Sequence, residues 1–517
     1  MIVRRAGAVL VLLAASVLAV SGAAYAAPVE DEGADCPISQ GSVTANATLP
    51  DPFTRIDGTR ITTVADWRCR RAEIKDQAER YVYGAKPDRP ATVGGTVTRT
   101  GITVNVAEAG RSASFSATVD LPSGTGPFPA VVVIGGFGAD TASIKAAGAA
   151  VISYDPLAVG REGTPRTNKQ GAFYSLYGAS SSTGILLAWA WGVSRIIDVI
   201  EQSGGTILKA DATGVTGCSR YGKGAIVTGA FDQRIALTMP IESGTGGAPI
   251  FRGVPGESGA QPLSSAYSEQ PWLGDAFGSY TGNPAGLPVD THELVGMVAP
   301  RGLFIMDNPH ISWLAARSSS VAALGGAEVY RALGATSAIS YWSDVSDGTH
   351  CATRAEWRDP LQNSIRKFLG GTGSAPGVFR VSSKAAGSLA AWRTWQTPVL
   401  TGGSASPSPT VSPTASPSPV PAGCAATVAL NQWNGGFVAT VRVTAGSAPV
   451  SGWTVSMTLP SGAAVTNTWN ASAGGSGGAV GFTNAAHNGA LAAGGSTEFG
   501  FQGTGSASGV TPVCVAR

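Results

Sequence analysis

The sequence predicts a large α/β domain with a mostly parallel sheet, followed by a small all-β domain. Continuous apolar runs at 129–134, 149–154 and 302–306 are typical of strands that are buried on both faces. Between them, 185–200 carries apolar residues at the i, i+3 and i+4 spacing of a helix. From residue 424 onwards, short alternating segments are separated by Gly, Ser and Asn turns, which is the pattern of a β-sandwich.

A linker separates the two domains. Residues 404–421 read SASPSPTVSPTASPSPVP, and alternating Pro, Ser and Thr cannot bury apolar surface. Such a segment stays extended and semi-rigid, and its hydroxyls are candidate O-glycan sites. We therefore expect the α/β domain at 35–398, the linker at 399–423 and the small domain at 424–517.

The N-terminus resembles an export signal. Arg4-Arg5 precedes an apolar run at 8–20, and Ala24-Tyr25-Ala26 has the small-x-small pattern of a cleavage site. The alternative is a membrane anchor, but the run is short of the ~20 residues that a span needs. We expect residues 1–26 to be a signal peptide and the protein to be secreted and extracellular.

Composition excludes several classes of partner. The net charge is +2, 13% of residues are charged, and no Lys/Arg block occurs, so nucleic acid is not expected as a partner. The four histidines are scattered without metal-ligand spacing. We expect no metal, no cofactor and no membrane association, and a monomer.

The most informative motif is Gly217-Cys218-Ser219-Arg220-Tyr221-Gly222-Lys223. It follows a β-prone stretch, 212–216, and precedes a helix-compatible one, 224–230. A serine on a sharp strand-to-helix turn is the nucleophile elbow of α/β-hydrolases, whose fold is a three-layer sandwich. The helix N-terminus there favours an oxyanion. The spacing G-x-S-x-x-G is one residue longer than usual, and the alternative is a glycine-rich turn with a capping serine.

A serine nucleophile needs a base, and His350 is the best candidate. It lies on a late loop after the strand-like 338–342, in the chain order Ser, acid, His. Of the others, His487 is in the small domain, His292 precedes a helical segment and fits the start of that helix, and His310 could line the cleft.

Two carboxylates are candidates for the acid that orients the base. Glu242 lies just past the probable strand 234–239, and Asp307 lies at the end of 302–306. The acid often follows the strand before that of the histidine, so chain order alone favours Asp307. For either residue the alternative is an ordinary surface ion pair.

The six cysteines fit an exported protein. Cys36 and Cys69 lie in the N-terminal region, and Cys424 and Cys514 bracket the small domain, which leaves Cys218 and Cys351. If these two bond, their Cα atoms lie within about 7 Å, and the neighbouring Ser219 and His350 are held close together. The alternative is two buried free thiols.

The motif around Ser219 resembles the G-C-S-R-x-G-K signature of glucuronoyl esterases, carbohydrate esterase family 15. The resemblance covers essentially the whole large domain. The additional residue between Ser219 and Gly222 is part of the family signature. The further matching blocks are 240–247, 272–273, 300–303 and 348–351.

The resemblance implies a Ser219–His350–Glu242 triad, which moves our expectation for the acid from Asp307 to Glu242. It also implies the disulfides Cys218–Cys351 and Cys36–Cys69. A third disulfide of some fungal members has no cysteines here.

The family hydrolyses esters that join 4-O-methyl-glucuronic acid of glucuronoxylan to lignin alcohols. Arg220 is suited to the oxyanion through its backbone N–H and guanidinium. Lys223 would reach the sugar hydroxyls, Gln261 and Glu269 match polar sugar-binding positions, and Trp313 matches an aromatic contact. Without the resemblance, these would be a solvated helix residue, loop residues and a core residue. The segment Gly135-Gly136-Phe137 follows a strand, a position that could border the oxyanion site in other hydrolases. Here we interpret it first as a tight structural turn.

The small domain resembles a family 2 carbohydrate-binding module, whose flat aromatic side chains stack on glucose rings. Trp433 and Trp469 match two of its three surface aromatics. His487 stands at the third position, which should weaken binding or shift its preference. Trp453 matches a core position. The matching blocks are 431–437, 451–455, 468–469, 484–489 and 499–501.

We therefore expect a secreted glucuronoyl esterase that works through an acyl-enzyme on Ser219 and is tethered to cellulose or xylan of the plant cell wall. One alternative is an acetyl xylan or feruloyl esterase with the same triad. Another is a non-catalytic cellulose-binding protein.

Overall fold

The computed structural model describes residues 29–39, 41, 45–402, 423–433, 436–486, 488–507 and 510–517. These residues divide into two compact units, one ending by residue 402 and the other beginning at residue 423. The expected signal peptide, 1–26, and most of the expected linker lie outside the described residues.

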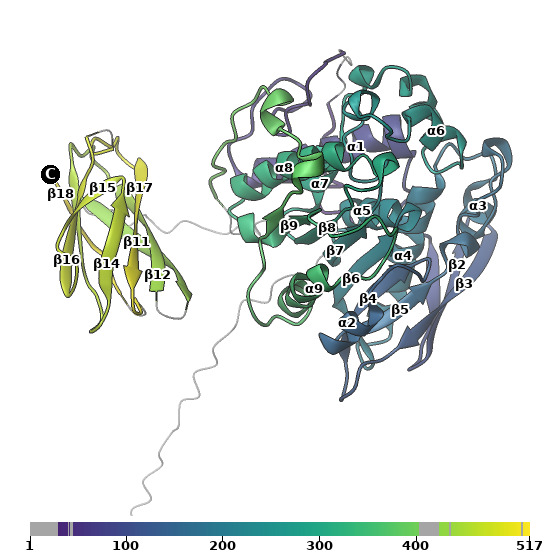
Figure 1. Cartoon of the computed structure of the whole chain (residues 1–517), viewed down its shortest axis with the longest axis horizontal. Coiled ribbons are helices and arrows are strands. Elements are labelled where there is room, and N and C mark those ends of the chain that lie inside the picture. The colour runs from purple at the N-terminus through teal and green to yellow at the C-terminus, as the bar shows by residue number, and fades with distance from the viewer. Residues whose placement is uncertain are drawn as a thin grey trace, which may run out of the picture. The chain divides into compact units, whose positions relative to one another are not determined.

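The first unit is built on a ten-stranded sheet of order β1-β2-β3-β5-β4-β6-β7-β8-β9-β10 (Figure 1). Strands β4 to β10 are parallel, and β1 to β3 continue the sheet as antiparallel strands. The strands are β1 Thr92–Val97, β2 Gly101–Glu108, β3 Arg111–Asp120, β4 Phe128–Ile134, β5 Ala150–Tyr154, β6 Leu208–Cys218, β7 Ile235–Ile241, β8 Gly302–Met306, β9 Ile339–Trp342 and β10 Phe379–Arg380.

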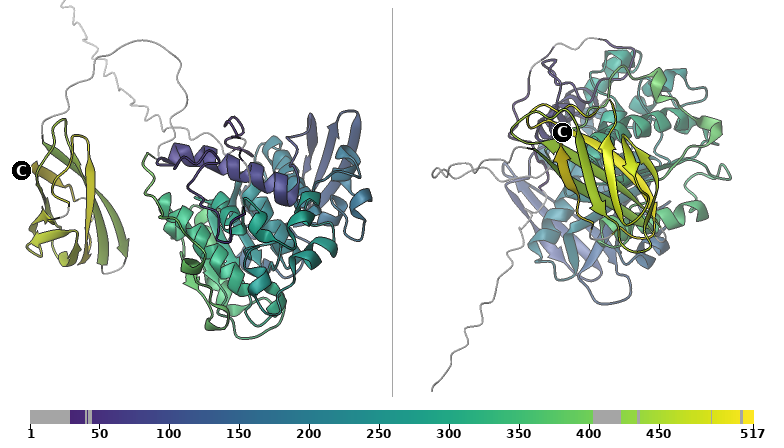
Figure 2. Two further views of the ribbon diagram at one scale, coloured as in Figure 1. Left: turned by 90° about the horizontal axis from the view of Figure 1, so that it is seen from above. Right: turned by 90° about the vertical axis from the view of Figure 1, so that its left-hand side faces the viewer.

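Helices cover both faces of this sheet, as Figures 1 and 2 show. One face packs against α4, α5, α7 and α8, and the other against α2 and α9. On the first face, α1 lies against α7. The helices are α1 Val64–Ala78, α2 Thr141–Ala146, α3 Ala172–Tyr177, α4 Ile185–Gln202, α5 Arg220–Phe231, α6 Leu263–Ser268, α7 Thr291–Val298, α8 Ala316–Ala332 and α9 Ala355–Phe368.

Strand β4 shows why the sequence produces two cores. Ala130, Val132 and Ile134 belong to the core under α4 and α5, and Val131 and Val133 belong to the core under α2 and α9. Successive strand residues point to opposite faces, so a continuous apolar run buries both. The predicted three-layer α/β fold is confirmed, and the apolar runs expected to be strands are β4, β5 and β8.

The second unit consists of two four-stranded antiparallel sheets, β11-β12-β17-β14 and β15-β16-β13-β18. Trp453 is fully buried between them, and its indole N–H donates to Asn488 O at 2.9 Å, as expected for a core residue. The all-β prediction is confirmed. The strands are β11 Cys424–Trp433, β12 Gly436–Ala445, β13 Trp453–Thr458, β14 Ala464–Trp469, β15 Ala471–Gly474, β16 Ala479–Asn484, β17 Ser496–Thr504 and β18 Val513–Ala516.

The cysteines form three disulfides, and the pairs are those expected from the sequence. They are Cys36–Cys69, Cys218–Cys351 and Cys424–Cys514, the last of which joins the two sheets of the second unit. The free-thiol alternative for Cys218 and Cys351 is therefore wrong.

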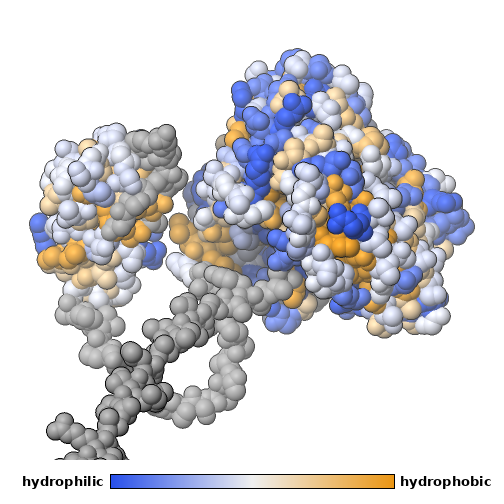
Figure 3. Space-filling view, turned by 90° about the horizontal axis from the view of Figure 1, so that it is seen from below, coloured by the Kyte–Doolittle hydropathy of each residue, from blue (hydrophilic) through white to orange (hydrophobic). Residues whose placement is uncertain are grey.

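On the face seen in Figure 3, apolar patches lie among hydrophilic and near-neutral residues on each unit. Such a mixture is usual for folded proteins. Within the described parts of the chain, no helix has the length and apolar character needed to cross a bilayer.

Candidate active site

Ser219 lies on the turn between β6 and α5. Its φ of +59° is rare for a residue with a side chain, and it marks the sharp turn expected of a nucleophile elbow. The Ser219 N–H donates to Ile241 O at 2.9 Å, and the Ser219 carbonyl accepts from Lys223 N–H at 3.0 Å. The turn is thus fixed to β7 on one side and to the first turn of α5 on the other.

The glycines on either side of Ser219 permit this turn. A Cβ on Gly217 would lie 2.6 Å from Tyr221 O, and a Cβ on Gly222 would lie 2.5 Å from Ile241 O. Both distances are too short for a side chain. At Gly217 the start of α5 therefore packs directly on β6, and at Gly222 it packs directly on β7. The longer G-x-S-x-x-G spacing therefore places its second glycine where the helix meets the neighbouring strand.

His350 and Glu242 are in direct contact. The Nδ1 of His350 donates to Glu242 Oε2 at 2.6 Å, and the Glu242 side chain is fully buried. Glu242 directly follows β7, and its N–H donates to Met306 O at the end of β8 at 2.7 Å. A carboxylate in this position fixes the tautomer of the histidine and leaves Nε2 free to accept a proton.

Several donors hold the Glu242 carboxylate in place. Cys351 N–H donates to Oε2 at 2.8 Å, and Asn308 Nδ2 donates to Oε1 at 3.3 Å. The Arg354 guanidinium lies 3.7 Å from Oε1. Both oxygens thus have partners, as a buried carboxylate requires.

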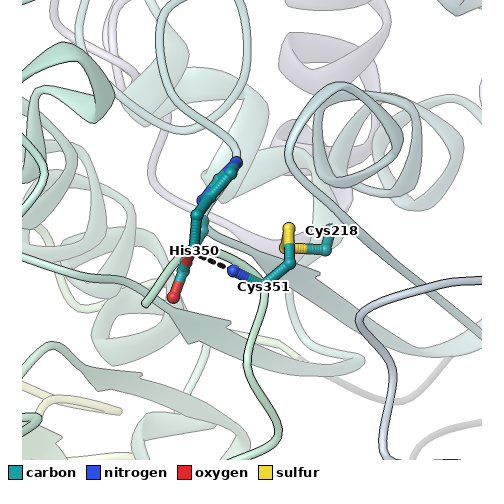
Figure 4. A group of neighbouring side chains, drawn as sticks. Cys218, His350 and Cys351 are labelled. Atoms are coloured by element: carbon teal, nitrogen blue, oxygen red, sulfur yellow. Dashed lines mark hydrogen bonds and ion pairs between the residues drawn. A yellow bond between two sulfur atoms is a disulfide. The ribbon is translucent and has the colours of Figure 1, made fainter. Parts of the chain in front are cut away.

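The disulfide Cys218–Cys351, drawn in Figure 4, joins the end of β6 to the loop that carries His350. Ser219 is the next residue after Cys218, so the bond holds the two catalytic candidates close together. The Cα atoms of the two cysteines are 5.8 Å apart. Among the described residues, Cys218, Glu242, His350 and Cys351 also form a group whose potential metal-ligand atoms lie within 4.8 Å of one another. Because the sulfurs are bonded to each other, this group offers no thiolate to a metal.

Asp307, the acid that chain order favours, has different surroundings. It is buried, and the Tyr341 hydroxyl donates to its Oδ2 at 3.4 Å. Burial, together with the nearby charge of Glu242, raises the pKa of Asp307 to about 7. A carboxyl group that is half protonated at neutral pH is a poor partner for an imidazolium, so the geometry favours Glu242.

Ser219 and His350 open into a cleft of about 690 Å³. All five residues that the resemblance assigns to the oxyanion and the sugar line the same cleft. They are Arg220, Lys223, Gln261, Glu269 and Trp313. The remaining lining residues are Phe137, Tyr221, Gly244, Gly259, Ala260, Pro262, Trp272 and Leu314.

Lys223 is a buried amine at the bottom of this cleft, not a solvated helix residue. Only 4% of its surface is exposed. Its Nζ donates to Ser243 O at 2.6 Å and lies 5.2 Å from the centre of the Trp272 ring. Burial lowers the pKa of Lys223 to about 7, while the charge of Glu269 opposes this shift.

The other sugar-contact candidates face solvent. Gln261 Nε2 donates to Glu269 Oε2 at 2.7 Å, so the two polar side chains form one group. Trp313 is 53% exposed, and its ring lies edge-on to His350 with centroids 6.2 Å apart. An indole this exposed is available for stacking on a sugar and is not a core residue.

Glu162 is a site residue that the sequence does not reveal. Its Oε2 accepts from Arg220 at 3.0 Å and its Oε1 accepts from the Trp272 indole N–H at 2.6 Å. The Arg220 guanidinium lies 5.5 Å from the centre of the Trp272 ring. Glu162 therefore fixes two side chains of the cleft wall, but a lone carboxylate on the loop after β5 belongs to no motif.

The remaining histidines of the first unit do not line the cleft. His292 is buried in α7, its Nε2 donates to Pro50 O at 2.9 Å, and burial lowers its pKa to about 4. His310 donates from Nε2 to Val345 O at 2.9 Å and accepts from Lys384 Nζ at 3.0 Å. The suggestion that His310 lines the cleft is not supported.

In the second unit, Trp469 ends β14 and is 39% exposed. Its ring lies over Gly500, where a Cβ would be 2.3 Å from the ring. Trp433 ends β11, but its side chain and the whole of His487 lie outside what the structure describes. Trp469 is therefore the one predicted aromatic contact of the second unit whose exposure is described.

Two family models match the chain. One, described as glucuronyl esterase of fungi, matches residues 104–334, and the other, described as a cellulose binding domain, matches residues 424–516. Each match falls within one of the two units.

Curated relatives extend the similarity to most of the first unit. A 4-O-methyl-glucuronoyl methylesterase of Hypocrea jecorina is 38% identical over 377 residues, which cover 71% of this chain and 80% of the relative. A 4-O-methyl-glucuronoyl methylesterase of Schizophyllum commune is 37% identical, over 75% of this chain and 99% of the relative.

Solved structures show the same similarity. The glucuronoyl esterase catalytic domain of Hypocrea jecorina has a TM-score of 0.66 and 37% identity, covering 71% of this chain and all of that one. A mutant glucuronoyl esterase of Sporotrichum thermophile, solved in complex with methyl 4-O-methyl-β-D-glucopyranuronate, has a TM-score of 0.66 and 36% identity over the same 71% of this chain and all of its own.

The contact between His350 and Glu242 generates a first prediction. We expect Glu242→Ala to lower kcat for a methyl glucuronate ester by about 10³- to 10⁴-fold, as loss of the triad acid does elsewhere. Asp307→Ala should cost at most about tenfold, because it removes a group that does not orient the base. Steady-state kinetics on variants with matched melting curves would test this ranking, and the reverse order would place the acid after β8.

The buried amine of Lys223 generates a second prediction. Lys223 is charged below about pH 7 and neutral above it, and a neutral amine donates a weaker hydrogen bond to a sugar hydroxyl. We expect KM to rise as the pH increases through 7, and Lys223→Met to remove this dependence. Lys145→Met, on the exposed face of α2, is the matched control. A KM that keeps its pH dependence in Lys223→Met would contradict the assignment.

The lowered pKa of Lys223 also affects the free energy of unfolding. The pKa of Lys223 is lower in the folded chain than in the unfolded one, so the unfolded chain binds more protons between pH 7 and about 10.5. The free energy of unfolding should therefore gain a contribution that increases with pH across that window. Urea titrations of the wild type and Lys223→Met at several pH values would measure it.

Proposed function

The chain belongs to the glucuronoyl esterase family, carbohydrate esterase family 15, and from this we propose how it works: it is a secreted serine esterase that cleaves the ester between 4-O-methyl-D-glucuronic acid of glucuronoxylan and lignin alcohols. One observation carries the proposal. A buried carboxylate holds a histidine at 2.6 Å, and that histidine shares a cleft with a serine on a strained turn and with polar and aromatic side chains suited to a sugar.

In the acylation step, His350 Nε2 takes the proton of the Ser219 hydroxyl as Oγ attacks the ester carbonyl. Glu242 accepts the hydrogen bond from Nδ1 and stabilises the imidazolium that forms. When the tetrahedral intermediate collapses, His350 gives this proton to the leaving alcohol. A water molecule then attacks the acyl carbonyl while His350 takes its proton. The Ser219 oxygen leaves, receives the proton from His350, and the glucuronic acid is released.

The ester carbonyl is neutral until it is attacked, so the negative charge develops only in the transition state. Arg220 is the first residue of α5, so its backbone N–H lies at the N-terminal end of the helix, next to Ser219. This end carries the positive partial charge of the helix dipole. Its guanidinium is held by Glu162 at 3.0 Å in the cleft wall. Donors fixed in advance lower the barrier because they need no reorganisation.

The rest of the cleft has the chemistry of a sugar site. Lys223, Gln261 and Glu269 offer both donors and acceptors to ring hydroxyls. Trp313 offers an exposed flat face to the apolar side of the ring. These groups bind the acyl half of the ester.

The second unit anchors the enzyme to an insoluble polysaccharide, cellulose or xylan, through the exposed ring of Trp469 and, by the family resemblance, through Trp433. The disulfides fit an oxidising, extracellular setting. We expect the secreted enzyme to act as a monomer, without a metal or cofactor.

The proposed activity predicts turnover of methyl 4-O-methyl-glucuronate by the purified chain. We expect Ser219→Ala to lower kcat by about 10⁴- to 10⁶-fold, because the nucleophile is lost. Ser123→Ala, on an exposed loop before β4, is the matched control. If the chain releases acetate from acetylated xylan but leaves the glucuronate ester intact, the proposed substrate is wrong.

The proposed anchor predicts that the full chain sediments with microcrystalline cellulose. We expect Trp469→Ala to weaken binding about tenfold, which corresponds to the loss of one stacked aromatic contact. Val513→Ala, at an exposed position on β18, controls for a general effect of removing apolar surface. Binding to insoluble xylan but not to cellulose would identify xylan as the anchor.

A further inference from the structure

The aromatic side chain of Phe137 has no role in the site described so far. We propose that Phe137 is a specificity-determining residue: its ring lines the part of the cleft that receives the alcohol half of the ester, and it sets how strongly the enzyme favours an aromatic alcohol over a small one. The inference rests on the proposed esterase function and deepens it.

Phe137 stands out by its exposure. Among the described residues of the first unit, the exposed large apolar side chains are Val29, Phe137, Trp313 and Val399. The two aromatic ones, Phe137 at 50% and Trp313 at 53% exposure, line the same cleft as Ser219. Scattered exposed apolar residues need no explanation, but two exposed aromatics in one catalytic cleft indicate a role in binding.

The loop that carries Phe137 is fixed to the catalytic residues. Gly135, Gly136 and Gly138 all have φ near +75°, which only glycine adopts easily. A Cβ on Gly138 would lie 2.5 Å from the Cβ of Cys218 and 3.0 Å from that of Cys351. The backbone next to Phe137 therefore packs on the disulfide that joins the Ser219 and His350 loops.

The ring of Phe137 also has a packing partner inside the cleft. It packs edge-on against Tyr221, with ring centroids 5.4 Å apart, and Tyr221 is in the first turn of α5. The loop glycines explain the turn, but they do not require a phenylalanine at its tip. A supported aromatic side chain that still projects into a cleft loses little entropy when a ligand covers it.

The sheet order places Phe137 opposite the sugar-contact groups. Ser219 follows β6, and Phe137 follows β4, which is the neighbour of β6 on one side. Gln261 and Trp313 belong to segments after β7 and β8, which lie on the other side of β6. Ser219 therefore lies between the Phe137 loop and the segments that carry Gln261 and Trp313, which we call the polar wall.

The chemistry of ester cleavage assigns an occupant to the second wall. The carbonyl carbon sits at Ser219 Oγ, so the acyl half and the alcohol half extend from this point in different directions. Sugar hydroxyls need the polar wall, and the alcohol oxygen must reach His350 Nε2 to be protonated. Phe137 offers no hydrogen bond, so it selects an apolar group, and an aryl ring meets it with the geometry that aromatic pairs prefer.

Kinetics with two esters that share the acyl half test this inference. We would measure kcat/KM for benzyl and methyl glucuronate, because kcat/KM reports steps up to acylation, in which the alcohol is still present. We expect Phe137→Ala to lower the benzyl-to-methyl ratio about three- to tenfold, from the typical strength of an aromatic pair. Phe137→Tyr should keep the ratio of the wild type.

Trp313→Ala is the matched control, because it removes an exposed aromatic from the polar wall. It should lower kcat/KM for both esters by the same factor and leave the ratio unchanged. Melting curves establish that each variant is folded. An unchanged ratio in Phe137→Ala, while the wild type cleaves both esters, overturns the inference and leaves the proposed function intact. A wild type that cleaves neither ester overturns both.

Discussion

The covalent bond between Cys218 and Cys351 is the constraint on which the rest of the site depends. It joins residues 133 positions apart in the chain, one immediately before the serine and the other immediately after the histidine. With the bond in place, the loop after β9 cannot move away from the end of β6. The hydrogen bond from Cys351 N–H to Glu242 extends the same constraint to the end of β7. Three loops of a parallel sheet thereby become one rigid group.

Much of this arrangement could be predicted from residue order alone. A serine between two glycines at a strand-to-helix junction predicted the elbow, and the structure places Ser219 on such a turn. His350 was the histidine whose place on a late loop after a strand fits the order Ser, acid, His, and it lines the cleft. The apolar run of β4 predicted a strand buried on both faces, because a strand with one solvated face would alternate.

The choice between Glu242 and Asp307 could not be made in this way. Both follow adjacent parallel strands, β7 and β8, so both lie at the same edge of the sheet. What separates them is a direct contact with His350 for one and burial against Tyr341 for the other. Chain order favoured Asp307, whereas the family resemblance and the geometry favour Glu242. Glu162 carried no sequence signal, and Phe137 was interpreted only as part of a tight turn, because the importance of both comes from neighbours distant in the chain.

The ion pairs in the cleft bear on the fate of the product. Hydrolysis converts a neutral ester into a uronate anion, and an enzyme with spare positive charge would hold that anion tightly. Here Arg220 is already paired with Glu162, and the amine of Lys223 is close to losing its proton at neutral pH. The carboxylates of Glu242 and Glu269 lie in or next to the same cleft. Under the proposed function, a cleft whose positive charges are already paired or close to neutral should hold the uronate product only weakly and release it readily.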